Sequence, residues 1–223
     1  MNRIILIGNG FDLAHGLKTR YSDFINWYWK QRIKGFYGVS SNTSKDDLCT
    51  LTIRLFSSWN EFAINYTQYT TEDFFDLIKK YPENFSISFT SSLFEEIHKS
   101  IKTKNWVDIE EIFYKQLTQG SRSNIKRVND ELENIKNKLI EYLQEIQKSI
   151  SKDIIRLDIR AKILEEVQEK DIAIKSKNNN PYLKQTLSDI LLLNFNYTSV
   201  ADMYLPTPNR FQPKANKFSL IHI

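Results

Sequence analysis

The sequence predicts an α/β protein: a parallel sheet formed by strands near the two ends of the chain, with a large and mainly helical insertion between them. Two observations carry this prediction. A short apolar run at residues 3–7 stops at a glycine-rich turn, which is typical of a buried strand that leads into a helix. A second apolar run, at residues 189–195, is typical of a strand buried on both faces of a parallel sheet.

The composition is that of one large globular domain, or of one domain with a sizeable insertion. The chain has 223 residues, of which 41% are hydrophobic and 26% charged, and it can therefore bury a core. The net charge of +4 is mild and the lysines alternate with acidic residues, so the sequence does not predict nucleic-acid binding. A single cysteine and the lack of a membrane-length apolar run lead us to expect a cytoplasmic protein.

Several classes of enzyme site are absent from the sequence. The three histidines are far apart and none is paired with a cysteine, so we expect no metal site of the usual zinc-ligand spacing. The chain also has neither a G-x-S-x-G nucleophile elbow nor a G-x-x-x-x-G-K-[ST] phosphate loop.

The turn after the first strand carries Gly8, Gly10 and Gly16, half of the six glycines in the chain. A strand, a tight glycine turn and the start of a helix can hold a pyrophosphate, because the ligand approaches closely and the free N–H groups favour anions. The spacing is not that of the G-x-G-x-x-G fingerprint, since Leu13 stands at the place of its third glycine. The alternative is a turn of the same shape that binds nothing.

The insertion is predicted to be helical in several pieces. Apolar spacing predicts helices at residues 21–33, 48–66, 72–81, 90–101 and 106–117, with a polar loop at residues 35–47. Residues 123–150 then carry a heptad seam, and residues 151–175 predict a second long helix. The two long helices can pair as an antiparallel hairpin, or the seam can meet a second subunit.

Polar side chains follow the strand at residues 189–195. Asn194, Asn196 and Thr198 stand at its carboxyl end, which is the edge of an open α/β sheet where ligands bind. A proline-rich loop and one more strand, at residues 218–223, complete the pattern. We therefore predict a core of residues 1–34 and 182–223 and a helical insertion of residues 35–181.

Two of these motifs resemble a known family. The stretch GNGFDLAHG at residues 8–16, together with NFNYT at residues 194–198, resembles the bacteriophage abortive-infection AbiH family, and WVDIE at residues 106–110 is similar to a further motif of that family. The first two stretches also resemble degenerate forms of the sirtuin NAD-binding signatures. This resemblance implies a Rossmann-like (sirtuin-like) sheet that takes NAD as substrate or ligand, and related domains in phage defence break NAD to nicotinamide and ADP-ribose.

The resemblance also implies roles for individual residues. Asn196 matches the sirtuin asparagine that helps to place water at the ribose carbon, whereas sirtuins carry aspartate where this chain has Thr198. Asp12 could hydrogen-bond a ribose hydroxyl or water. The residues implied to contact the nucleotide are Gly8, Asn9, Gly10, Phe11, Asp12, Gly16 and Asn194.

The catalytic histidine of the sirtuin pattern has no motif match in this sequence. In sirtuins it stands in a His-Gly pair at the end of a strand, and His222 is followed by isoleucine, so the matching histidine could lie beyond this end of the chain. His222 is a candidate by its position near the carboxyl end of a strand; the alternative is a strand residue without a role.

These observations leave three readings open. The first is a phage-defence protein that binds NAD or a related nucleotide and hydrolyses it. The second is a non-catalytic nucleotide sensor. The third is an interaction protein whose long helices assemble a homo-oligomer or bind a partner in a defence system.

Overall fold

The computed structural model describes residues 2–36, 42–54, 70–103, 109–118, 122–165, 189–205 and 217–222. It confirms a mixed α/β protein with a small parallel sheet and many helices. The chain divides into two compact units, which we describe separately: a terminal unit of residues 1–19 and 145–223, and a central unit of residues 20–144. The predicted division into a core of residues 1–34 and 182–223 and an insertion of residues 35–181 stays a prediction.

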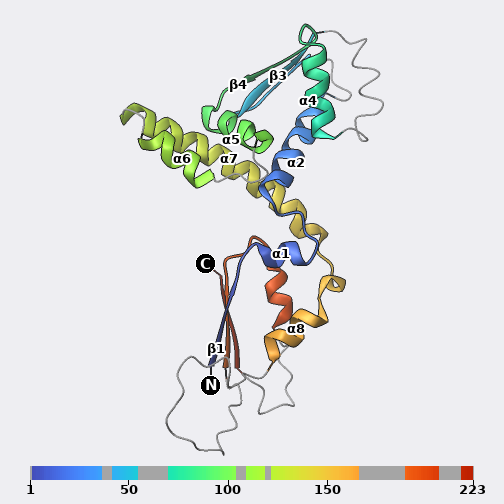
Figure 1. Cartoon of the computed structure of the whole chain (residues 1–223), viewed down its shortest axis with the longest axis vertical. Coiled ribbons are helices and arrows are strands. Elements are labelled where there is room, and N and C mark those ends of the chain that lie inside the picture. The colour runs from blue at the N-terminus through green and yellow to red at the C-terminus, as the bar shows by residue number, and fades with distance from the viewer. Residues whose placement is uncertain are drawn as a thin grey trace, which may run out of the picture. The chain divides into compact units, whose positions relative to one another are not determined.

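The terminal unit is built on a parallel sheet of three strands in the order β1-β5-β6 (Figure 1). These strands confirm the three that the sequence predicts, and they are β1 (Asn2–Ile7), β5 (Asp189–Asn194) and β6 (Lys217–His222). The helices of this unit are α1 (Gly10–Ala14), α8 (Leu157–Leu164) and the 3-10 helices η1 (Lys152–Ile154) and η3 (Ser199–Tyr204).

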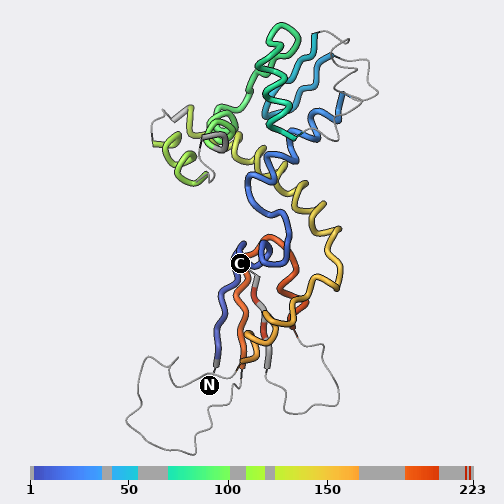
Figure 2. Tube along the Cα trace, turned by 45° about the vertical axis from the view of Figure 1, so that its right-hand side comes forward, coloured from blue at the N-terminus to red at the C-terminus, as the bar shows by residue number. Residues whose placement is uncertain are grey.

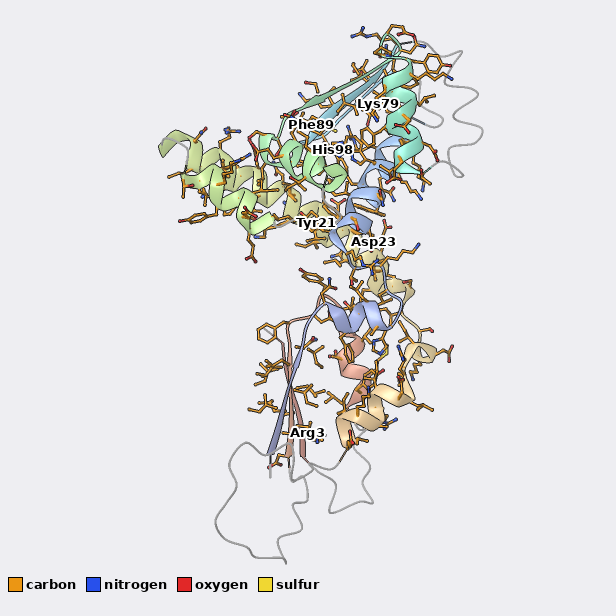
Figure 3. All side chains as sticks on the ribbon, in the orientation of Figure 1. Arg3, Tyr21, Asp23, Lys79, Phe89 and His98 are labelled. Atoms are coloured by element: carbon orange, nitrogen blue, oxygen red, sulfur yellow. The ribbon has the colours of Figure 1, made fainter. Side chains whose placement is uncertain are left out.

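One face of the parallel sheet carries the core of this unit. Alternate residues of the strands are buried there against α8 and η3, which lie on the same side of the sheet in Figure 1. Arg3 of β1, labelled in Figure 3, adds a polar tie, because its guanidinium donates a hydrogen bond of 2.9 Å to the carbonyl of Ile163 near the end of α8. The buried residues of this core are Ile7, Ile163, Ile190, Leu192, Val200, Ala201 and Tyr204.

Among the described residues, the opposite face of the parallel sheet carries exposed apolar side chains. Ile4 and Leu6 of β1 are 63% and 69% exposed, and Ile221 of β6 is 49% exposed. A parallel sheet is normally covered on both faces. In the described part of the chain, α8 and η3 cover one face of this sheet, and Ile4, Leu6 and Ile221 lie on the other.

The central unit combines helices with an antiparallel sheet in the order β2-β3-β4. Its strands are β2 (Thr43–Lys45), β3 (Cys49–Ile53) and β4 (Phe85–Phe89). Its helices are α2 (Tyr21–Lys34), α4 (Thr71–Lys80), α5 (Ser92–Thr103), α6 (Ile109–Thr118) and most of α7 (Arg122–Ser149).

Aromatic side chains form the core of the central unit. Trp29 is fully buried, and its indole N–H donates to Nδ1 of the buried His98 at 3.3 Å. The rings of Phe75 and Phe89 lie 4.6 Å and 5.7 Å from the His98 ring, and Figure 3 labels Phe89 beside His98. His98 is therefore a packed core residue.

The helix predicted at residues 48–66 is wrong in its described part, which is the strand β3. Cys49, Leu51 and Ile53 are buried while the two threonines between them are half-buried. This period of two is that of a strand, and the neighbouring strands satisfy its backbone. Residues 55–69 lie outside the described part. The predicted loop at residues 35–47 contains the short strand β2, and β4 was not predicted at all.

The predicted hairpin of two long helices is wrong in the described part of its second arm, and residues 166–175 of that arm lie outside the described residues. Helix α7 confirms its first arm, and Val128, Ile135 and Tyr142 of the heptad seam are buried. The described residues of the second arm form only η1 and the eight-residue α8, whose Ile159 and Ile163 belong to the core of the parallel sheet. Packing of these two side chains against the parallel sheet overrides the local helical pattern.

The remaining predicted helices are confirmed as α2, α4, α5 and α6, while residues 104–108, which include part of the WVDIE stretch, lie outside the described part. A sheet of three strands does not by itself establish a Rossmann-like or sirtuin-like fold, which stays a prediction.

Candidate functional site

The three strands of the terminal unit end side by side. Ile7 of β1 is in register with Asn194 of β5, and Asn194 with His222 of β6. The N–H of Phe195 donates to the carbonyl of Ile7 at 2.8 Å, which extends the ladder past the strand ends. Figure 2 shows β1 in blue beside β5 in orange, with α1 at their carboxyl ends. The glycine turn, the NFNYT stretch and the backbone of His222 therefore meet at one edge of the sheet.

A carboxylate of the glycine turn joins the two sequence motifs. Asp12 of α1 is fully buried, and its Oδ1 accepts hydrogen bonds from Nδ2 of Asn196 at 2.6 Å and from the hydroxyl of Thr198 at 2.5 Å. The backbone N–H of Asn196 in turn donates to Oδ1 of Asn194 at 3.0 Å. Residues that are far apart in the sequence thus form one polar cluster, which we call the Asp12 cluster: Asp12, Asn194, Asn196 and Thr198.

The Asp12 cluster retains unused acceptors. Oδ2 of Asp12 and Oδ1 of Asn196 are shielded from bulk water and have no hydrogen-bond partner among the described residues. Burial raises the pKa of the Asp12 carboxyl above its ordinary value, although the hydrogen bonds from Thr198 and Asn196 and the charge of His15 act in the opposite direction. Unpaired enclosed acceptors are costly in a folded protein, and they are often explained by a ligand or function.

The three glycines of the turn differ in whether their backbone conformation requires glycine. Gly16 has a φ of +77° and ends α1, where its N–H donates to the carbonyl of Leu13 at 3.0 Å. Gly8 and Gly10 have no positive φ, and a Cβ built on either would meet nothing within 4 Å. Glycine is thus structurally required only at Gly16.

Two predicted ligand contacts use their side chains within the protein. The amide of Asn9 accepts from the hydroxyl of Thr19 at 2.6 Å and donates to the carbonyl of Thr19 at 3.2 Å. The ring of Phe11 lies 4.5 Å from that of His15 and 5.3 Å from that of Tyr204, against the core of the sheet. In this structure both residues shape the turn, and their role toward a ligand stays a prediction.

The sequence reasoning missed a buried hydrogen-bond chain behind the turn. Nδ1 of His15 lies 2.6 Å from the carbonyl of Phe11, so this nitrogen must carry the proton. Nε2 lies 2.5 Å from the hydroxyl oxygen of Tyr204, and this hydroxyl accepts from the N–H of Arg156 at 2.8 Å and donates to the carbonyl of Arg156 at 3.4 Å. Only the position of His15, four residues after Phe11 in the motif, hinted at this role, because Tyr204 and Arg156 stand in no recognisable pattern.

Other classes of site find no support in the part of the chain that the structure describes. No group of three or more His, Cys, Asp or Glu side chains there could hold a metal ion. No described helix combines the length and the hydropathy that a membrane span requires.

Comparison with known proteins identifies the family. Neither the curated proteins nor the solved structures contain a match to this chain. The family model described as "Bacteriophage abortive infection AbiH" matches residues 4–222, which include the glycine turn, the NFNYT stretch, β5, β6 and β1 from Ile4 onward. The chain therefore belongs to the AbiH family of bacteriophage abortive infection proteins.

Proposed function

We propose that this abortive infection protein acts in defence against bacteriophage by binding NAD or a related nucleotide at the carboxyl edge of β1, β5 and β6, and by hydrolysing NAD to nicotinamide and ADP-ribose. The observation that carries the proposal is the Asp12 cluster. Its two unpaired acceptor oxygens, on Asp12 and Asn196, suit the hydroxyl groups of a ribose or a water molecule.

The open space at Gly8 and Gly10 supports the proposal. Neither residue needs glycine for its backbone conformation or for packing against a described neighbour. Close approach of a ligand to the backbone is a further reason for glycine at such a position. Because α1 has only five residues, we assign no weight to its dipole in binding phosphate.

The proposed reaction needs positioning more than a strong base. The bond between the ribose C1′ and the nicotinamide nitrogen breaks, and both electrons leave with nicotinamide. Water adds to C1′ and releases one proton, which gives ADP-ribose. The ribose carbon becomes positively charged in the transition state, and oriented acceptor oxygens such as those of Asp12 and Asn196 stabilise that charge.

A sensor that binds the nucleotide without hydrolysing it is the alternative. It is favoured by one observation: His222 aligns with Asn194 at the sheet edge, yet the glycine that follows the catalytic histidine in the sirtuin pattern is replaced by Ile223. In that case the same site binds the ligand, and another part of the chain responds.

The test is chromatography of NAD incubated with the purified chain, with three variants beside it. Asn196→Ala removes the proposed water-positioning amide, and we expect a loss of turnover of about 100-fold or more. Gly10→Val fills the open side of the turn, and we expect NAD no longer to raise the unfolding temperature. Asn137→Ala, on the exposed surface of α7, is the matched control and should behave like the unchanged chain.

The outcomes separate the readings. Nicotinamide and ADP-ribose that vanish with Asn196→Ala support the hydrolase. Stabilisation by NAD without products, lost with Gly10→Val, supports the sensor and refutes hydrolysis. An unchanged chain that neither turns over nor is stabilised by NAD refutes both and leaves assembly through the helices as the remaining reading.

A further inference from the structure

The orientation of the Asn196 amide follows from the chemistry of its neighbour. A carboxylate oxygen only accepts hydrogen bonds, so the atom of Asn196 that lies 2.6 Å from Oδ1 of Asp12 must be the amide nitrogen. The amide oxygen therefore points away from Asp12, and it is the atom without a partner among the described residues. The contact is also charge-assisted, which makes it stronger than a neutral hydrogen bond.

We propose that Asp12 is a positioning residue: it fixes the side chain of Asn196 so that Asn196 offers an acceptor oxygen to the substrate. This inference rests on the proposed function and deepens it. It assigns Oδ1 of Asp12 to Asn196 as its partner, while Oδ2 keeps the ribose or water contact proposed above. It also names the chemistry that Asn196 contacts, because an acceptor takes a hydroxyl group or water and repels a phosphate oxygen.

The hydroxyl of Thr198 supports this assignment. It donates to the same oxygen of Asp12 at 2.5 Å and accepts from the N–H of Val200 at 3.3 Å, so it caps η3 and holds the carboxylate in place. Asp12 is fully buried between these donors. In the sirtuin pattern that the NFNYT stretch resembles, a carboxylate stands where this chain has Thr198, and here the carboxylate comes from the glycine turn instead.

The test exchanges the two side chains in the full-length chain and measures NAD turnover. Asn196→Asp sets two carboxylates against each other and should lower turnover about 100-fold. Asp12→Asn leaves a neutral amide that can face Asn196 in either sense, and should lower turnover about tenfold. Independent effects would multiply to about 1,000-fold in the double variant. In the double variant, the amide at position 12 can donate to the carboxylate at position 196, whose other oxygen is then the acceptor offered to the substrate. We therefore expect its NAD turnover to recover to within about tenfold of that of the unchanged chain.

The outcomes distinguish failure of the positioning role of Asp12 from failure of the proposed NAD hydrolysis. Urea unfolding establishes first that the exchanged chain is folded, and Asn196→Ala serves as the reference if Asn196→Asp does not fold. An exchanged chain that is folded but as slow as either Asn196 variant refutes the positioning role and leaves the proposed function standing. An unchanged chain without NAD turnover refutes the proposed function, and this inference falls with it.

Discussion

The hydroxyl of Tyr204 offers a sharp test of how the glycine turn is held. Tyr204→Phe removes one oxygen and keeps the ring, so the packing against Phe11 should persist. The change removes the 2.5 Å bond with Nε2 of His15, the 2.8 Å bond from the N–H of Arg156 and the 3.4 Å bond to the carbonyl of Arg156. The substitution thus separates the hydrogen bonds of this hydroxyl from the packing around the ring.

The size of the effect follows from the burial of the two groups left behind. His15 is 9% exposed, so its unpaired Nε2 costs about 1–3 kcal/mol. Arg156 is an exposed residue whose N–H water can reach in part, and we assign that loss about 1 kcal/mol. We therefore expect Tyr204→Phe to lower the free energy of unfolding of the terminal unit by about 2–4 kcal/mol.

The assay has to report on the terminal unit alone. Trp27 and Trp29 lie in the central unit, so their fluorescence does not serve. Hydrogen exchange of the backbone amides of β1 and β5 does, because protection there reports the opening of the parallel sheet. Tyr114→Phe, at a residue of α6 that is 69% exposed, is the matched control. A loss below about 0.5 kcal/mol with Tyr204→Phe, within the range of ordinary surface changes, would refute the reasoning.

Three further predictions use other described contacts. Gly16→Ala should lower the stability of the terminal unit by about 1 kcal/mol because of its positive φ, whereas Gly10→Ala should not; equal losses in hydrogen exchange would contradict this. Glu131 is 7% exposed and accepts hydrogen bonds from the hydroxyl of Ser91 and the N–H of Leu93. Glu131→Ala should therefore lower the free energy of unfolding of the central unit by about 3 kcal/mol, measured by urea unfolding followed by tryptophan fluorescence. Glu133→Ala, at an exposed position, is the control, and a loss below about 1 kcal/mol with Glu131→Ala would contradict the prediction. Burial raises the pKa of the Asp12 carboxyl, so the folded chain binds a proton there more tightly than the unfolded chain does. The contribution of Asp12 to the free energy of unfolding should therefore grow as the pH falls from neutral toward the ordinary pKa of 3.8. A difference in unfolding free energy between the unchanged chain and Asp12→Asn that does not vary with pH would contradict this prediction.

Local patterns predicted the parallel sheet well. The runs at residues 3–7 and 189–195 are short, apolar and bounded by turn residues, which few structures other than a buried strand accommodate. The same reasoning failed at β3. The alternation of Cys49, Leu51 and Ile53 covers only five residues, and these lie within the longer apolar stretch of residues 48–66, whose composition also suits a helix. It failed again at α8, where contacts with distant strands decide how far the helix extends.

The candidate site was predictable in place but not in detail. The glycine turn and the NFNYT stretch each follow a predicted strand, and parallel strands bring their carboxyl ends to one edge. The contact of Asp12 with Asn196 and Thr198 depends on the register of β1 with β5 and on the path of α1, which no local pattern encodes. The bond between His15 and Tyr204 is of the same kind.

The pairing of β1 with β5 also affects the order in which the parts of the terminal unit fold during synthesis. Asp12 and Asn196 are separated by 184 positions, so the carboxylate emerges from the ribosome long before its partner does. Contacts between such distant residues form slowly, after a large loop has closed. Until β5 has been synthesised, β1 has no neighbour in its own sheet and the candidate site does not exist. A nascent chain therefore carries the glycine turn before the Asp12 cluster can form.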